Sequence, residues 1–271
     1  MTADYLDVIF WSLVGGLFSI IGGALLLVNK GIAIKLSNLL LPFAAGALLG
    51  AAFLDLLPEA LELGAEGSAF RWVVAGIITF FLLEHYLHWF HHHHEHNGEK
   101  QLKPTAPLII IGDTLHNAID GIAIGAAFTI SPATGIVTAI AVAAHEIPQE
   151  VGDFGVLLKT GMARIRVLGW NMLSALATLI TAVYTFYLGS QESLPLGAIL
   201  GLAAGFFIYI ATSDIIPSIH EEAKGKFAKI PALFIIIGVL VVGVVADQAH
   251  ERLEGANTHR QDNSSIQVES H

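Results

Sequence analysis

Two short polar stretches, HNAIDG at residues 116–121 and HEIPQE at residues 145–150, decide the fold of this chain. Each lies inside an apolar run long enough to cross a bilayer, which takes about 20 residues. Polar side chains at that depth are costly, and they usually mark a path for an ion or a proton. Imidazole nitrogen and carboxylate oxygen are also ligands that a divalent ion such as zinc accepts. The two stretches therefore predict a membrane protein that handles an ion.

The composition favours the same class of protein. Of the 271 residues, 54% are hydrophobic and only 13% are charged, whereas soluble domains carry about 25% charged residues. The formal charge of −10 sits largely at loops, span ends and the C-terminal tail, so no nucleic-acid partner is expected. The chain has no cysteine, which excludes thiolate ligands and disulfides.

Apolar runs recur along the whole chain and predict an all-α, polytopic membrane protein with about eight transmembrane helices. Strand-type alternation is absent, which argues against a barrel. We expect one transmembrane domain over residues 1–251, with a His-rich cytoplasmic loop at 91–103, and a polar, disordered tail at 252–271. The expected spans lie near residues 6–28, 37–61, 71–90, 105–129, 134–158, 166–188, 196–218 and 229–250.

The basic residues predict the orientation. Most of them fall in the odd-numbered loops between the expected spans, which should therefore be cytoplasmic. Both termini are then extracytoplasmic, in a multi-pass protein of the cell (plasma or inner) membrane. These loop residues are Lys30, Lys35, Lys100, Lys103, Lys159, Arg164, Arg166, Lys224, Lys226 and Lys229, against Arg71, Arg252 and Arg260 on the other side.

A short sequence similarity between two of the expected spans predicts an inverted-repeat-like arrangement. The second span ends with DLLP at residues 55–58, and the seventh ends with DIIP at residues 214–217. With eight spans, these two helices run in opposite directions, as do the fourth and fifth spans, which carry the polar stretches. Transporters built from inverted repeats bind their substrate near the bilayer midplane.

The polar residues of the fourth and fifth spans form two stripes, because helical residues three and four apart share a face. Two such stripes face to face supply enough nitrogen and oxygen ligands for one or two divalent ions. Pro148 adds a free carbonyl at Ala144, since proline cannot donate the helical hydrogen bond. The stripe on the fourth span contains Asp113, His116, Asn117 and Asp120, and the stripe on the fifth contains His145, Glu146, Gln149, Glu150 and Asp153.

Three small residues accompany these stripes. Gly121, Gly125 and Gly152 would allow neighbouring helices to approach closely.

Other readings of the same residues remain open. In one of them the polar groups only hold the helices together, but so many polar groups on two neighbouring spans exceed what helix packing needs. A proton-translocating membrane protein without metal is an alternative, because His and carboxylate chains also build proton relays. An intramembrane metal-dependent hydrolase would use His145 and Glu146, but its signature requires a second His where Gln149 stands. We therefore expect no enzyme and no cofactor.

At these residues the chain resembles the ZIP (Zrt/Irt-like) divalent metal transporter family, in particular its LIV subfamily. The resemblance lies in GDTLHNAIDGIAIG at residues 112–125, HEIPQEVGDF at 145–154 and LLPEA at 56–60, together with the His-rich loop. It implies transport of zinc, with iron or manganese as alternatives, toward the cytosol through a mononuclear or binuclear site between the fourth and fifth spans. By position in the motifs, that site would be lined by His116, Asn117, Asp120, His145, Glu146 and Gln149, and Glu150 on the same stripe completes the predicted set of metal ligands. The partners expected on this basis are a divalent metal ion as substrate, the lipid bilayer and a second copy in a homodimer.

The chain departs from the subfamily pattern at three positions. Gln149 replaces the second His of the fifth-span motif, which removes a nitrogen ligand and puts the preference for zinc in doubt. Asp55 stands where a His is common, and Ser218 follows Pro217 where an acidic residue is common.

Overall fold

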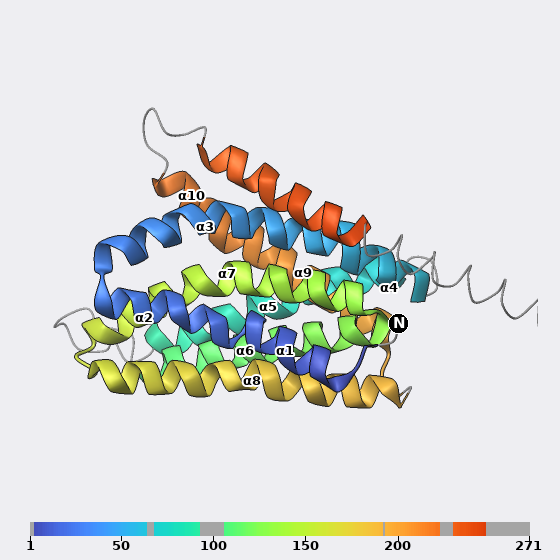
Figure 1. The fold of residues 1–271 in the computed structure, drawn as a ribbon, viewed down its shortest axis with the longest axis horizontal. Helices are drawn as coiled ribbons and strands as arrows, with labels where there is room; N and C mark the ends of the chain where they lie inside the picture. The colour runs from blue at the N-terminus through green and yellow to red at the C-terminus, as the bar shows by residue number, and fades with distance from the viewer. Residues whose placement is uncertain (1–2, 64–67, 93–105, 192, 223–229, 248–271) are drawn as a thin grey trace, which may run out of the picture.

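The computed structural model describes residues 3–63, 68–92, 106–191, 193–222 and 230–247. Within these ranges all regular structure is helical, and the helices line up as eight rods (Figure 1), which confirms the all-α fold. The α-helices are α1 (Tyr5–Gly15), α2 (Ile20–Val28), α3 (Lys30–Ala51), α4 (Leu57–Leu63), α5 (Ser68–His92), α6 (Ala106–Ile130), α7 (Pro132–Lys159), α8 (Arg164–Ser190), α9 (Leu196–Tyr209), α10 (Ile216–Glu222) and a C-terminal helix, Ile230–Asp247.

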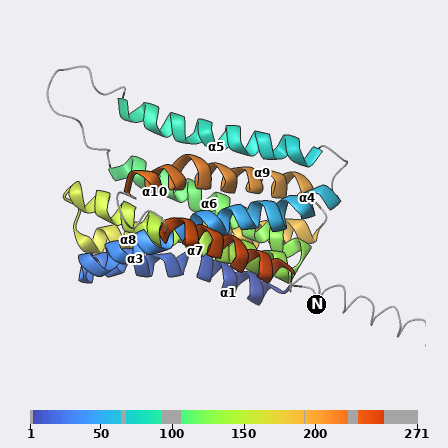
Figure 2. The same cartoon turned by 90° about the horizontal axis from the view of Figure 1, so that it is seen from above.

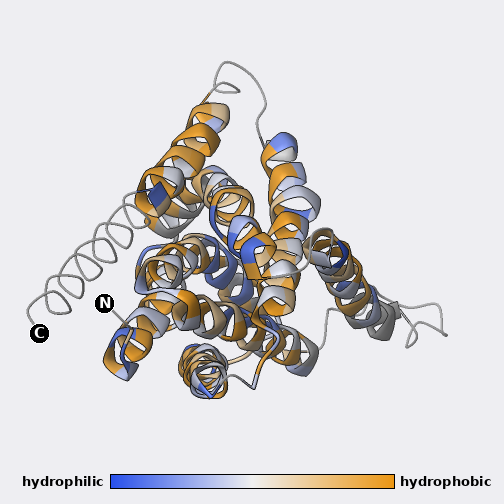
Figure 3. Cartoon of the chain, turned by 90° about the vertical axis from the view of Figure 1, so that its right-hand side faces the viewer, coloured by the Kyte–Doolittle hydropathy of each residue, from blue (hydrophilic) through white to orange (hydrophobic). Residues whose placement is uncertain are grey.

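The rods have the length and surface of membrane spans. Six of them are long and apolar enough to cross a bilayer, and the other two, α6 and α7, are the rods that carry the polar stretches. Large apolar side chains such as Ile180 and Leu240 are exposed, at 64% and 59%. In the end-on view most of the helical ribbon is hydrophobic, and hydrophilic stretches occur on helices in the middle of the bundle (Figure 3). Soluble proteins bury most of their large apolar side chains, whereas here many are exposed, which is the pattern of an integral membrane protein.

The N-terminal half of the chain shows where helix ends differ from the prediction. The first rod is interrupted by a 3₁₀ turn, η1 (Leu17–Ser19), directly after Gly15 and Gly16. Between α2 and α3 only Asn29 is non-helical, and its side chain accepts a hydrogen bond of 3.1 Å from the backbone N–H of Ile32. This N-cap starts α3 at once. The predicted first loop is therefore wrong in extent, and both Lys30 and Lys35 belong to α3.

Two π-helical turns occupy matching places in the second and seventh rods. The turn η2 (Ala52–Leu56) joins α3 to α4, and η3 (Ile210–Ile215) joins α9 to α10. Each ends two residues before the proline of an Asp-x-x-Pro motif, Pro58 or Pro217. Because proline has no N–H, the preceding turn loses a normal helical hydrogen bond and widens. The two rods run in opposite directions (Figure 1), in keeping with the expected inverted-repeat-like arrangement.

Helices α6 and α7 lie at the centre of the packing. Helix α7 contacts α1, α2, α3 and α6, while α6 packs most extensively on α8, and α5 lies to one side against α9 (Figure 2). On α6, a Cβ atom at Gly121 or Gly125 would collide with backbone carbonyls of α8, at Thr178 and Ala182. The prediction of close approach at Gly152 is wrong, because nothing lies within 4 Å of its Cβ direction.

The junctions α2–α3 and α7–α8 lie at the same end of the bundle (Figure 1), so Lys30, Arg164 and Arg166 gather at that end. The His-rich segment beyond His92 and the tail at 252–271 fall outside the described residues. What the sequence predicts for both segments stays a prediction.

Candidate metal site

The site is built from the facing sides of α6 and α7. Helix α6 contributes Asp113, His116 and Asp120, which follow one another at helical spacings of three and four. Helix α7 contributes His145 and Glu146, with Glu150 one turn further on. These side chains gather into two clusters that share one residue.

The first cluster contains His116, Asp120, His145 and Glu146, whose ligand atoms all lie within 4.8 Å of one another. The Nε2 atoms of the two histidines are 3.1 Å apart. From Asp120 Oδ2 the distance is 3.2 Å to His145 Nε2 and 3.7 Å to His116 Nε2. From Glu146 Oε1 it is 3.7 Å to His116 Nε2 and 3.9 Å to His145 Nε2.

A backbone hydrogen bond sets the orientation of His145. Its Nδ1 lies 3.0 Å from the carbonyl oxygen of Ala141, one turn earlier in α7. Because a carbonyl can only accept, Nδ1 must carry the proton, and a neutral imidazole then presents the Nε2 lone pair to the cluster. Metal-binding histidines in proteins are commonly held in this way by their second nitrogen.

The second cluster contains Asp113, Glu146 and Glu150, again with ligand atoms within 4.8 Å of one another. Glu146 therefore belongs to both clusters and connects them. Three carboxyl groups with no imidazole make this cluster an all-oxygen set, which suits harder cations better than the first cluster does.

Several oxygen atoms of the two clusters are buried without a hydrogen bond. They are Asp120 Oδ2, both carboxyl oxygens of Glu146 and both of Glu150. The side chains of Asp120 and Glu146 are 2% and 0% exposed, while that of His116 keeps 12%. Buried carboxyl oxygens are costly unless they are paired or bind a cation. The arrangement is thus chemically suited to hold a positive ion.

The predicted ligand Asn117 is hydrogen-bonded to helix α8 and to Asp113, and its part in metal binding stays a prediction. Its Oδ1 accepts a hydrogen bond of 2.8 Å from the hydroxyl of Thr178. Its Nδ2 donates to Asp113 Oδ1 at 2.9 Å and to Ser174 Oγ at 3.5 Å. Gln149 is partly buried one turn after His145, and its part in metal binding stays a prediction.

Sequence reasoning missed two neighbours of the site. Thr178 anchors Asn117, and Phe80 of α5 packs edge-on against the ring of His116, with ring centroids 5.5 Å apart. Both residues lie in apolar spans away from the polar stretches, so no local pattern marks them. Only the tertiary packing, of α8 on α6 and of α5 on α9, brings them to the site.

We expect Thr178→Val to destabilise the protein by about 1–3 kcal/mol, because it leaves the buried Oδ1 of Asn117 without its donor. Thermal unfolding of the purified protein in detergent measures the change. Thr212→Val is the matched control, since the exposed Thr212 hydroxyl bonds only the Ile208 carbonyl of its own helix. Equal loss of stability in the two variants would contradict the anchoring role.

The fold and these clusters define a class: a helical membrane protein with imidazole and carboxyl groups buried between two central helices. The family model described as "ZIP Zinc transporter" matches residues 6–107 and 91–246. The chain belongs to the ZIP zinc transporter family, which confirms the resemblance found in the sequence.

Individual relatives agree with this membership. The chain is 33% identical over 218 residues to "Zinc transporter ZIP13" of Pongo abelii, covering 75% of this chain and 65% of the relative. It is 30% identical over 270 residues to "Zinc transporter zipt-7.2" of Caenorhabditis elegans, covering 78% of this chain and 58% of the relative. It is 43% identical over 117 residues to "Metal cation symporter ZIP14" of Xenopus tropicalis, covering 43% of this chain and 25% of the relative. The chain thus spans less than two thirds of the length of these relatives.

Proposed function

We propose that this protein transports divalent metal cations across its membrane through the clusters between α6 and α7. Zinc is the expected substrate, with iron(II) and manganese as alternatives. Membership of the ZIP zinc transporter family and the printed names of the relatives support this choice. The comparisons offer no support for the hydrolase or for the metal-free proton carrier.

One observation carries the proposal, namely the spacing of ligand atoms in the first cluster. Zinc bound tetrahedrally at about 2.0–2.2 Å places its ligand atoms about 3.3–3.6 Å apart. The five distances among His116, Asp120, His145 and Glu146 run from 3.1 to 3.9 Å. The four ligand atoms therefore lie near the corners of such a tetrahedron, and small side-chain rotations would complete it.

The second cluster offers the ion a second binding site next to the first. A cation leaving the first cluster would keep Glu146 as a ligand while Asp113 and Glu150 replace the histidines. Glu150 belongs to the ligand set in this way. A shared ligand lowers the cost of the transfer, because the ion is never stripped of all its ligands at once.

The distribution of basic residues supports an orientation in the membrane. The basic residues at the α2–α3 and α7–α8 end support a cytoplasmic location for that end, with both termini extracytoplasmic. Transport toward the cytosol of a plasma or inner membrane, and a homodimeric state, belong to the same proposal.

The proposal is tested with the purified full chain in proteoliposomes loaded with a metal-sensitive dye. We expect zinc to enter these vesicles faster than protein-free vesicles, with saturation as the external zinc concentration rises. Rates equal to those of protein-free vesicles for zinc, iron(II) and manganese would overturn the proposed function.

Gln149 gives a prediction about selectivity. It follows His145 by one helical turn and so shares its face. Since an imidazole nitrogen suits zinc better than an amide oxygen, Gln149→His should lower the half-saturation for zinc and raise the ratio of zinc to manganese uptake by about tenfold. Uptake of both metals at matched protein levels measures the ratio. Gln191→His, at the far end of α8, is the control. An unchanged ratio would remove Gln149 from the site.

A further inference from the structure

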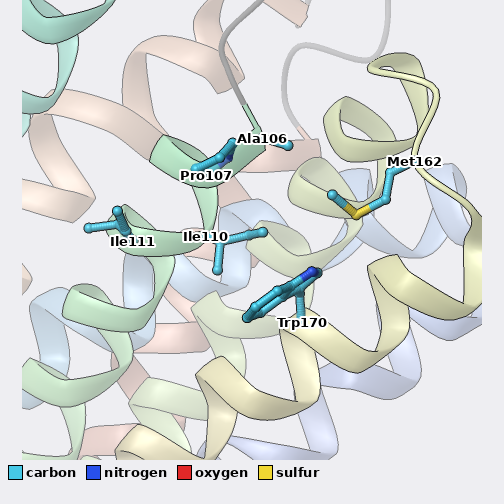
Figure 4. A pocket seen from close by; sticks show the side chains of 6 residues that line it. All are labelled: Ala106, Pro107, Ile110, Ile111, Met162 and Trp170. Carbon is cyan, nitrogen blue, oxygen red and sulfur yellow. The ribbon is translucent and has the colours of Figure 1, made fainter.

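A cavity lies between the first two turns of α6 and of α8, with Met162 of the α7–α8 link at its side (Figure 4). Its volume is about 340 Å³, at the lower end of the range of about 300–1,000 Å³ that is typical of ligand sites. It opens outward from the bundle. Six apolar side chains line it, those of Ala106, Pro107, Ile110, Ile111, Met162 and Trp170.

The lining restricts the occupant to an apolar group. Apart from the indole N–H of Trp170, its side chains carry no strong hydrogen-bonding group, so a sugar, nucleotide or free ion would lose its hydration without compensation. Trp170 is 43% exposed and Ile111 is 51% exposed. At the surface of a membrane protein, such exposed apolar walls meet lipid chains.

A basic residue near the cavity indicates which class of lipid would occupy it. Arg166 precedes Trp170 by four residues on α8, so the two side chains share a helix face, and Arg166 lies one turn nearer the helix end. The side chain of Arg166 is exposed. Tryptophan is enriched at the membrane interface, and basic groups beside clefts between spans bind anionic lipid headgroups.

We propose that this cavity binds an acyl chain of an anionic phospholipid, with the headgroup phosphate held by Arg166. The chain lies against Trp170 and the Ile110 side of α6, and the headgroup stays at the basic end of the bundle. In the orientation proposed above, this is the cytoplasmic leaflet. None of the residues that line this cavity belongs to the two clusters proposed to bind the transported ion.

The fluorescence of Trp170 tests the proposal directly. The other three tryptophans are replaced (Trp11→Phe, Trp72→Phe and Trp89→Phe), and the full chain is placed in phosphatidylcholine vesicles. Brominated phosphatidylglycerol or brominated phosphatidylcholine is then added at increasing mole fractions. We expect half-quenching at an about fivefold lower mole fraction for the anionic lipid than for the zwitterionic one, which is the preference that one basic group near the membrane surface confers.

Three variants of this single-tryptophan protein control the result. Arg166→Gln should remove the preference for the anionic lipid, and Arg166→Lys should largely keep it. Ala106→Phe fills the cavity without touching the charge and should reduce quenching by either lipid. A companion protein that keeps only Trp11, partly buried in α1, should show no preference. Equal quenching of Trp170 by both lipids, or a preference that survives both Arg166→Gln and Ala106→Phe, overturns the proposal.

Discussion

Asp120→Ala is expected to abolish zinc uptake in proteoliposomes while leaving the amount of folded protein unchanged. Asp120 Oδ2 lies within 3.7 Å of the Nε2 atoms of both histidines in the first cluster, so its loss removes the carboxylate nearest to them. Loss of a residue that hydrogen-bonds to a metal ligand already lowers metal affinity by about 10–100-fold. Loss of a direct ligand should lower the affinity by more than about 100-fold. His145→Ala should have an effect of the same size.

The folded state should tolerate this change. Removing Asp120 gives up its 3.2 Å contact with His145 Nε2, but it also relieves the closeness of buried carboxyl groups in the first cluster, so we expect little net loss of stability. Asp247→Ala, on the exposed face of the C-terminal helix, is the matched control and should transport like the wild type. Wild-type uptake by both Asp120→Ala and His145→Ala would sink the assignment of the first cluster.

The second large effect is expected from Gly121→Leu, which should prevent α6 from packing on α8. The added Cβ would collide with the backbone carbonyl of Thr178, and backbone cannot move aside as a flexible side chain can. We expect a loss of more than about 3 kcal/mol of folding free energy, the upper end of typical overpacking costs. Thermal unfolding and the yield of monodisperse protein in detergent measure it.

Gly169→Leu supplies the comparison, because Gly169 lies on α8 with nothing within 4 Å of its Cβ direction. This variant adds the same side chain to a membrane helix and should unfold near the wild-type temperature. If the two leucine variants were equally stable, α6 and α8 would not approach as closely at Gly121 as the structure shows.

Much of the fold could be predicted because its signals are local. Long apolar runs mark the rods, and helical spacing of three and four places Asp113, His116 and Asp120 on one face. The same reasoning put His145, Glu146 and Glu150 on the facing helix. The structure brings these residues together as two clusters.

The rest depends on contacts that no sequence window contains. Only Asn29 separates α2 from α3, because its side chain caps the start of α3 even though two lysines follow. A hydropathy pattern does not show such a cap. The hydrogen bond of Asn117 with Thr178 likewise forms only once α8 packs against α6, so the sequence does not show it. Gly152 illustrates the converse, since a small residue in a polar stretch faces no neighbouring helix.

X-ray absorption at the zinc K-edge tests the central claim, that the first cluster binds the transported ion. The sample is the purified chain with His91, His92, His93, His94 and His96 replaced by Asn, loaded with one equivalent of zinc. We predict four nitrogen or oxygen ligands at about 2.0–2.2 Å, two of them imidazoles, and one imidazole fewer in His145→Ala. A spectrum with no imidazole, or one that His145→Ala leaves unchanged, would contradict the account.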